Sequence, residues 1–478
     1  MNSPRTFAVA AILACCAAAC AIRSMSSTCI VRTADGDVQG LDLDSSCAYL
    51  GIPYAAPPVG ELRWKPPQPA PSWTPSTLLA TSEPPACAQV SPEGSSTISG
   101  SEDCLTLSIW TPAVPRATPS PVIAWIHGGG FTSTSEGISD REARRLIAKT
   151  GAVVVSINYR VGPFGFLAHS ELSRETPGYA SSGNYGLLDQ RAALAWIRDR
   201  IAAFGGNPLD VTLAGQSAGA HSVSLHVVSP RSAGYFSRAI MQNGWASTRW
   251  RTIADAKALG QELAATLGCP EPSPLSCLRS KSTEQVLLAL PTGLEQFAET
   301  ARAPWGPVVD GLDIPDQPRA MYETGRFNHV PIVIGTARDE GYVMVNRSFP
   351  SDLTPAVYDA EIEAEFGTGD APAIRAKYPL AAFRSPKDAL ARITADAESV
   401  CEARRIAAFA ARVGIPVAAY SLEHRSVFDF IGDGWRQLQA GDYVAITDQN
   451  TASPTAPCDL WGPLFLASVA GSVPASMP

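Results

Sequence analysis

The sequence predicts an α/β fold with a mostly parallel central sheet that is flanked by helices. Three observations support this prediction: the chain is long and apolar enough for a large core, strand-like and helix-like segments alternate along it, and several strand-like runs are apolar on both faces. The 478 residues are 45% hydrophobic and show no internal repeat. This organisation fits one large α/β unit better than several small ones.

The strand-like segments appear in chain order at residues 122–126, 152–157, 211–214 and 331–335. Strands buried on both faces, as in parallel sheets, are apolar throughout, and the run at 152–157 has this character. The clearest helix precedes the third of these strands. Its apolar residues recur at spacings of three, four and seven, which places them on one helical face before a Gly-Gly stop. They are Leu187, Leu194, Ile197, Ile201 and Phe204.

A Gly-Gln-Ser-Ala-Gly segment at residues 215–219 joins the third strand to a helix-compatible stretch at 218–228. A serine on a tight strand-to-helix turn projects its hydroxyl clear of the sheet, and the flanking glycines leave room for the crowded backbone. Such a motif alone is weak, because it also occurs as an ordinary turn in glycine-rich chains. Its context predicts a nucleophile elbow with Ser217 at the apex.

A second glycine-rich segment, His-Gly-Gly-Gly at residues 127–130, follows the first strand-like run. Its N–H groups are therefore expected at the carboxyl edge of the same sheet. We expect Gly129 and Gly130 to join the N–H of Ala218 as an oxyanion hole, which acts on the charge that develops in the transition state. The two motifs in this order predict acyl-transfer chemistry.

From about Val31 to Ser426 the chain resembles the type-B carboxylesterase and cholinesterase family of α/β hydrolases. The segments that carry this resemblance, besides the two glycine-rich motifs, are Gly51–Ala55, Pro57–Gly60, Ser101–Leu105, Asn158–Arg160 and Gly183–Gln190. The resemblance implies an α/β-hydrolase fold and hydrolysis of small-molecule carboxylic esters through an acyl-serine intermediate. It implies no metal and no cofactor.

The resemblance also assigns the acid of the catalytic triad to Glu340, within Asp339-Glu340-Gly341. Most acidic side chains are simply solvated, so the residue type alone says little. Its position supports the assignment, because Glu340 follows the strand-like run 331–335 and lies C-terminal to Ser217. That is the Ser, acid, His order of this fold.

The expected base histidine is not found, and we leave the general base unassigned. In the family it lies in a segment similar to Gly-x-x-His-Gly-x-Glu, beyond a strand that ends in a Tyr-x-x-x-His-Arg-like motif. Here residues 417–425 match that strand, so His424 occupies the strand-end position, and residues 436–478 contain no histidine. The remaining histidines are interpreted as part of the oxyanion loop, as helix residues after the elbow, or as structural or surface residues. They are His127, His169, His221, His226 and His329.

Three explanations for this mismatch remain open. The last stretch derives from an altered reading frame, a retained intron or a truncated product; the tail folds differently and brings His424 to Ser217; or the chain binds without hydrolysing. Without an imidazole to accept its proton, a serine hydroxyl is a poor nucleophile at neutral pH. The sequence therefore indicates a carboxylesterase, with a catalytically impaired, binding or adhesion protein as the alternative.

The charge and the terminal segments suggest a protein that is exported from the cytoplasm. A net charge of −8 and a pI near 5.4 argue against a nucleic-acid partner. Residues 1–22 resemble a secretory signal and are too short and alanine-rich for a membrane span, so we expect secretion, or lipid attachment in a bacterium. We divide the rest into a hydrolase domain at 23–430 and an atypical tail at 431–478.

Removing residues 1–22 leaves eight cysteines, an even number that suits an oxidising compartment. The family resemblance pairs Cys87 with Cys104 and Cys269 with Cys277. It places Cys401 at a third family position, with Cys458 as a candidate partner. Cys29 and Cys47 then remain as an additional pair.

Two departures from the cholinesterase pattern bear on the substrate. Cholinesterases hold a quaternary ammonium group over an aromatic face and carry a tryptophan in the loop between the first cysteine pair. In this chain that loop, residues 88–103, contains no aromatic side chain. Gln216 stands where cholinesterases carry a glutamate. Both differences favour neutral, fairly apolar esters. A third departure, Asn243 in place of serine, suggests nothing about activity from sequence alone.

Overall fold

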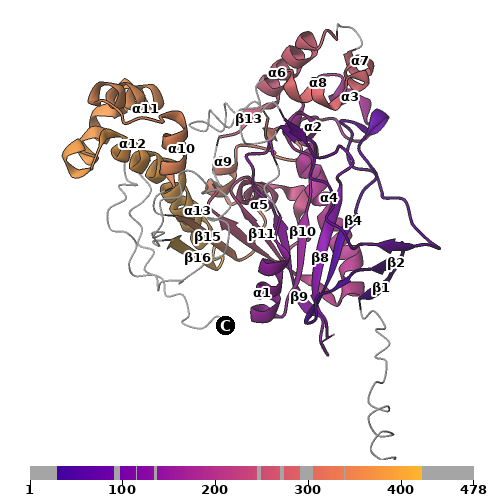
Figure 1. The fold of residues 1–478 in the computed structure, drawn as a ribbon. Helices are drawn as coiled ribbons and strands as arrows, with labels where there is room; N and C mark the ends of the chain where they lie inside the picture. Colours follow the sequence, from indigo (N-terminus) through magenta and orange to yellow (C-terminus); the bar gives the residue numbers. More distant parts are fainter. Residues whose placement is uncertain are drawn as a thin grey trace, which may run out of the picture.

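A nine-stranded sheet forms the centre of the described chain (Figure 1). The computed structural model describes residues 29–90, 97–114, 116–133, 137–244, 249–269, 274–290, 305–337 and 340–422. In spatial order the strands are β16 (Val417–Leu422), β15 (Ile332–Ala337), β12 (Arg238–Gln242), β11 (Gly206–Gln216), β9 (Ser120–Ile126), β10 (Val153–Ile157), β8 (Thr106–Pro112), β4 (Ser46–Pro53) and β3 (Leu41–Asp42).

The six strands from β16 to β10 pair in parallel, whereas β8, β4 and β3 continue the sheet with antiparallel pairings. This confirms the α/β class and the mostly parallel sheet that the sequence predicts. The carboxyl ends of β9, β11, β12 and β15 therefore meet at one edge of the sheet. The glycine-rich loop, Ser217 and Glu340 each follow one of these ends.

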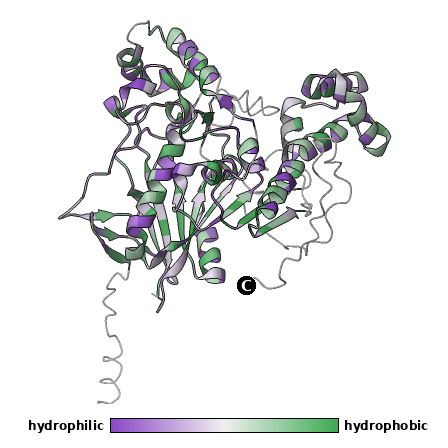
Figure 2. Cartoon of the chain, turned by 180° about the vertical axis from the view of Figure 1, so that it is seen from behind, coloured by the Kyte–Doolittle hydropathy of each residue, from purple (hydrophilic) through white to green (hydrophobic). Residues whose placement is uncertain are grey.

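Helices cover both faces of the sheet because its strands are apolar on both sides. All five residues of β10 are buried, and Val154 packs with α1 (Asp140–Thr150) on one face while Val153 and Val155 belong to the main cluster on the other. In Figure 2 the central strands are mainly hydrophobic, and the helices around them carry hydrophilic residues as well. On the main-cluster side, α4 (Tyr185–Arg200) and α5 (Ala218–Val228) pack against β11.

The helix predicted upstream of β11 is present as α4 followed by a 3-10 turn at Ile201–Phe204. All five residues of its expected apolar face are buried. Gly205 then adopts φ 80°, a left-handed conformation that ends the turn without the steric cost a larger residue would have.

The other elements lie mostly above and beside the carboxyl edge of the sheet (Figure 1). The helices are α2 (Gly162–Phe166), α3 (Leu172–Glu175), α6 (Ile253–Thr266), α7 (Pro274–Ser280), α8 (Thr283–Leu288), α9 (Pro318–Glu323), α10 (Gly341–Ser348), α11 (Pro355–Lys377), α12 (Pro386–Thr394) and α13 (Cys401–Arg412), with a π-helical turn at Ala395–Val400. The short strands are β1 (Ile30–Thr33), β2 (Gly36–Gln39), β5 (Thr77–Leu79), β6 (Gln89–Val90), β7 (Ile98–Ser99), β13 (Arg251–Thr252) and β14 (Val308–Val309).

Helices α10 to α12 form a lobe at one side of the molecule (Figure 1), with a hydrophobic cluster of their own that includes Tyr358, Ile362 and Ile374. This lobe is inserted between β15 and β16, two strands that pair directly. Among the helices of the described ranges, none is both long enough and apolar enough to cross a membrane.

Disulfides join Cys29 to Cys47, Cys87 to Cys104 and Cys269 to Cys277. The last two are the pairings that the family resemblance implies, and the first is the additional pair. Cys401 is also disulfide-bonded. Its candidate partner Cys458 lies outside the described residues, as do the expected signal segment 1–22 and the expected tail 431–478.

Candidate active site

Ser217 occupies a sharp turn between β11 and α5, with φ 55° and ψ −125°. Positive φ is strained for a residue with a side chain, and such strain is typical of a nucleophile elbow. The turn is tight because Gly219 lies against β9, where a Cβ atom would approach the Ile126 carbonyl oxygen to 2.0 Å. The Ser217 N–H donates to the Gln242 carbonyl at 3.0 Å, which ties the elbow to β12. The side chain is half-buried.

The glycine-rich loop after β9 lies directly beside this elbow. A Cβ atom on Gly128 would lie 3.0 Å from the Ser217 Cβ. Gly129 and Gly130 have φ of 111° and 62°, a backbone region open to glycine. The Gly129 carbonyl accepts the N–H of Ser133 at 3.0 Å, so the loop folds into a closed turn. The loop and the elbow are therefore neighbours in space, as the two motifs predict.

Glu340 lies shortly after β15, half-buried at the same sheet edge. Its carboxylate accepts the N–H of Ala337 at 3.1 Å and the side-chain amide of Asn243. Burial raises the pKa of Glu340, and these two donors act in the opposite direction because they stabilise the ionised carboxylate. The side chain is thus held in place by hydrogen bonds.

Asn243 connects the segments that carry Ser217 and Glu340, a contact that sequence reasoning missed. It follows β12, which lies between β11 and β15 in the sheet. Its own N–H donates to the Gly335 carbonyl of β15 at 2.8 Å, and its amide reaches Glu340. The sequence signal at this position was the departure from the family pattern, Asn243 in place of serine, which did not reveal the contact. Asn243 therefore holds the Glu340 carboxylate near the carboxyl ends of β12 and β15.

His226 is a structural residue of α5, as the sequence analysis expects. Its Nδ1 is 2.8 Å from the Ser232 hydroxyl and its Nε2 is 3.0 Å from the Gln190 side-chain oxygen, so both ring nitrogens are engaged. Burial lowers the pKa of His226 to about 3, with a smaller contribution from the positive charge of Arg191. The imidazole remains neutral at the pH values where an unfolded chain would protonate it.

This neutral imidazole predicts an acid-dependent loss of stability. Below about pH 6.5 the unfolded state binds a proton that the folded state does not, so the free energy of unfolding falls as the pH falls. The variant His226→Gln keeps an amide for the same partners but has no imidazole to protonate. When the pH is lowered from about 7.5 to 5.5, its free energy of unfolding is expected to fall by about 1 kcal/mol less than that of the original chain. Urea denaturation at both pH values measures this, and equal losses would contradict it.

His127 and His221 lie on either side of the elbow in sequence, and both side chains are buried. The Nδ1–H of His127 donates to the Gly128 carbonyl at 2.8 Å, and burial lowers the pKa of His127 to about 4. The His221 ring packs against Trp250 and Phe131, with ring centroids 5.4 and 6.2 Å away, and burial lowers its pKa to about 3. Both imidazoles therefore pack among buried aromatic side chains.

The remaining histidines belong to other segments than the elbow and the glycine-rich loop, or lie outside the described residues. His169 is buried and its Nδ1 accepts the N–H of Glu171 at 3.3 Å. His329 is exposed, with its Nε2 3.2 Å from the Gly325 carbonyl. Both fit the structural or surface roles expected for them. His424 lies outside the described residues.

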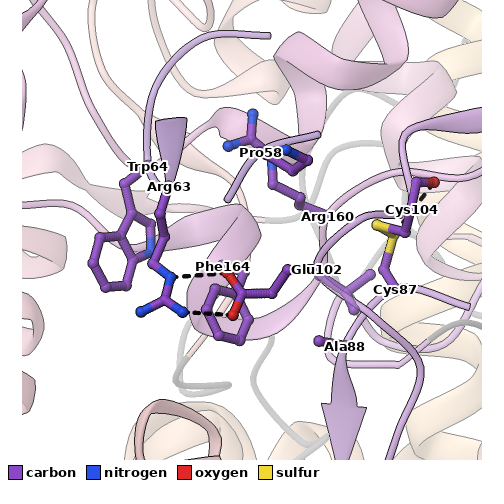
Figure 3. A pocket seen from close by; sticks show the side chains of 10 residues that line it. Pro58, Arg63, Trp64, Cys87, Ala88, Glu102, Cys104, Arg160 and Phe164 are labelled. Atoms are coloured by element: carbon purple, nitrogen blue, oxygen red, sulfur yellow. Dashed lines mark hydrogen bonds and ion pairs between the residues drawn. A yellow bond between two sulfur atoms is a disulfide. The ribbon is translucent and has the colours of Figure 1, made fainter. Parts of the chain in front are cut away.

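Figure 3 shows a recess beside the Cys87–Cys104 disulfide, and its lining includes none of the expected catalytic residues. It measures about 250 Å³, including space open to solvent, and Arg63 and Glu102 face each other within it. The Arg63 guanidinium donates two hydrogen bonds to the Glu102 carboxylate, at 2.6 and 2.8 Å. Glu102 belongs to the Ser101–Leu105 segment. Arg160 also lines the recess while its guanidinium is bound to Asp189. These family segments therefore stabilise the fold around the site.

Comparisons with known proteins agree with this geometry. The model of the carboxylesterase family matches residues 27–444. Acetylcholinesterase of Electrophorus electricus is 41% identical over 336 residues, which cover 65% of this chain and 51% of that protein. Acetylcholinesterase of Bungarus fasciatus is 40% identical over 330 residues, 65% of this chain and 53% of that protein.

Acetylcholinesterase of Danio rerio is 39% identical over 332 residues, again 65% of this chain and 51% of the relative. The chain thus spans about half the length of the curated relatives it matches. The family match nevertheless covers most of the 478 residues, and it confirms the resemblance and the α/β-hydrolase fold. The chain belongs to the carboxylesterase family.

Proposed function

We propose that this protein is a carboxylic ester hydrolase that acts through an acyl-serine intermediate with Ser217 as the nucleophile. The observation that carries the proposal is the strained turn at Ser217 with the Gly128 backbone packed beside it. Family membership supports ester hydrolysis as the reaction class. The intermediate and the roles of individual residues are the proposal's own content.

In this mechanism the Ser217 oxygen attacks the ester carbonyl, and the N–H groups of Gly129, Gly130 and Ala218 stabilise the resulting oxyanion. Ala218 is the first residue of α5, where backbone N–H groups lack partners within the helix and the helix dipole favours negative charge. One such donor typically contributes about 3 kcal/mol of transition-state stabilisation. Collapse of the tetrahedral intermediate expels the alcohol, and water then hydrolyses the acyl-enzyme.

Glu340 is proposed to orient and stabilise the imidazolium of the general base, the role of the acid in such triads. Its hydrogen bonds from Ala337 and Asn243 suit that role because they fix a half-buried carboxylate in one place. The base itself remains unassigned. Within this sequence, His424 is the histidine that follows Glu340, so His424→Ala is the variant that tests it.

We propose neutral esters as substrates, although the relatives named above are acetylcholinesterases. Gln216, next to the nucleophile, carries no charge, and the loop at 88–103 offers no aromatic face for a cation. A matched pair of esters tests this preference: acetylcholine and 3,3-dimethylbutyl acetate, its uncharged analogue. The full chain is expected to show a kcat/KM for the neutral ester at least equal to that for acetylcholine.

Release of acetic acid, followed by pH-stat titration, measures both reactions. Gln216→Glu restores a negative charge beside the serine and is expected to shift the ratio toward acetylcholine. A clear preference of the original chain for acetylcholine would contradict the proposed substrate class. Absence of hydrolysis of either ester would instead contradict the proposed reaction.

We also propose that the protein works outside the cytoplasm. Three disulfides among the described residues and the signal-like segment at 1–22 support this, because disulfides form and persist in oxidising compartments. The proposal includes either secretion or lipid attachment in a bacterium. Labelling of free thiols before and after reduction tests the oxidised state of the native protein.

Binding without hydrolysis is a second candidate function. The specific observation in its favour is that residues 425–478 contain no histidine, although the family's base is expected there. Against it stands the elbow, since a pure binding scaffold has no need for a strained serine beside a glycine-rich loop. A ligand that binds the full chain while Ser217 stays unreactive would favour this candidate.

A further inference from the structure

Tyr159 packs directly against the glycine-rich loop from the end of the neighbouring strand. It follows β10 and is fully buried. Its ring stacks on the His127 ring with centroids 4.3 Å apart and an angle of 13° between the planes. Its hydroxyl donates to the His127 backbone carbonyl at 3.1 Å. One side chain thus holds the first residue of the loop by both stacking and hydrogen bonding.

Ser222, on the helix that follows the elbow, lies beside the same hydroxyl: burial raises the pKa of Tyr159, and the nearby Ser222 side chain acts in the opposite direction. Ser222 donates its hydroxyl to the Ala218 carbonyl at 3.0 Å and accepts the Gln190 side-chain amide at 3.1 Å. Ala218 and the loop carry the proposed oxyanion donors, so Tyr159 lies between the two segments whose spacing defines the oxyanion hole.

The backbone next to Tyr159 is itself anchored. Arg160 donates its backbone N–H and its guanidinium to Asp189 of α4, at 3.1 Å and 2.7 Å. Both side chains of this ion pair are almost completely buried. Tyr159 therefore projects from a fixed part of the framework, which is what a positioning residue requires.

We propose that Tyr159 is a positioning residue that clamps the glycine-rich loop in place beside the elbow helix and so sets the spacing of the oxyanion donors. Its effect on hydrolysis rests on the proposed function, whereas the clamp itself does not. Without the hydroxyl, the His127 carbonyl loses this donor inside a buried site, and the loop has more freedom to open. Small displacements of catalytic groups reduce rates strongly because the donors must meet the developing charge.

Amide hydrogen exchange of the full chain tests the clamp directly. Tyr159→Phe keeps the ring and removes only the hydroxyl, and it is expected to speed exchange of peptides covering residues 127–133 about fivefold. Within that loop, the amides of Thr132 and Ser133 are bonded to the Gly129 carbonyl and report its opening.

The matched control is Tyr322→Phe. The buried Tyr322 hydroxyl is 3.1 Å from the hydroxyl of Ser224, which lies on α5 as Ser222 does. It does not contact the glycine-rich loop. Faster exchange at 127–133 in Tyr159→Phe alone supports the clamp. Unchanged exchange there, or an equal increase in Tyr322→Phe, overturns it. If Tyr159→Phe does not fold, Ser222→Ala removes the hydroxyl that neighbours Tyr159 on the helix side and is read in the same way.

Kinetics separate this proposal from the proposed function. If the original chain hydrolyses esters, Tyr159→Phe is expected to lower kcat about tenfold with KM within about twofold. An unchanged kcat would overturn the catalytic consequence of the clamp. If the original chain hydrolyses nothing, the proposed function fails, and the exchange result still decides whether Tyr159 holds the loop.

Discussion

Replacement of Asp189 by asparagine is expected to lower the free energy of unfolding by about 3–5 kcal/mol, because it leaves the Arg160 guanidinium buried without its counter-charge. The exposed fractions of the Arg160 and Asp189 side chains are 3% and 0%, so water does not compensate for the loss. The Nε and Nη2 atoms of Arg160 each donate to one oxygen of the Asp189 carboxylate at 2.7 Å. Urea denaturation, with constancy of the m-value as the check on two-state behaviour, measures the change.

The matched control is Asp199→Asn at an exposed ion pair on the same helix. Arg198 and Asp199 are 48% and 46% exposed, and such surface pairs contribute about 0–1 kcal/mol. A small effect at Asp199 with a large one at Asp189 fits the account. Equal, small effects at both positions would mean that the Asp189 pair does not anchor the strand end that carries Tyr159.

The elbow is expected to tolerate no side chain at Gly219. An alanine Cβ there would approach the Ile126 carbonyl oxygen to 2.0 Å, so α5 and β9 would have to separate. Overpacking of this kind typically costs about 1–3 kcal/mol. It would also pull the elbow away from the glycine-rich loop. Gly219→Ala is therefore expected both to destabilise the fold and to reduce the reactivity of Ser217.

Gly369→Ala provides the control for this substitution. Gly369 lies in α11, two residues after a kink at Gly367; a Cβ atom there meets nothing within 4 Å, and alanine favours helices over glycine. That variant is expected to be neutral or slightly stabilising in the same thermal and urea measurements. A Gly219→Ala protein as stable and as reactive as the original chain would contradict the close contact at the elbow.

Local patterns predicted the elements that position the site. The apolar face from Leu187 to Phe204, the run before Ser217 and the run before Glu340 each depend on neighbours in sequence, and the structure contains the corresponding helix and strands. The proximity of the glycine-rich loop to Ser217 followed because both motifs end parallel strands of one sheet. These inferences need only periodicity and the geometry of parallel sheets.

The contacts of Asn243 and Tyr159 were not predictable in the same way. Asn243 meets Glu340 across 97 positions of sequence, and the contact depends on the order in which β11, β12 and β15 assemble. Tyr159 was visible only as part of a family segment. Its partner His127 follows a different strand, so the stacking and the hydrogen bond could be assigned only from the three-dimensional structure.

Whether this protein hydrolyses esters depends on the reactivity of Ser217, which a fluorophosphonate probe measures. Such a probe phosphonylates a serine only when that oxygen is activated and its oxyanion site is formed. Intact-mass analysis of the full 478-residue chain is compared with Ser217→Ala and with His424→Ala. We expect one added probe on the original chain and none on Ser217→Ala. Loss of labelling in His424→Ala as well would identify the base, whereas an unlabelled original chain would contradict the role of Ser217 as the nucleophile.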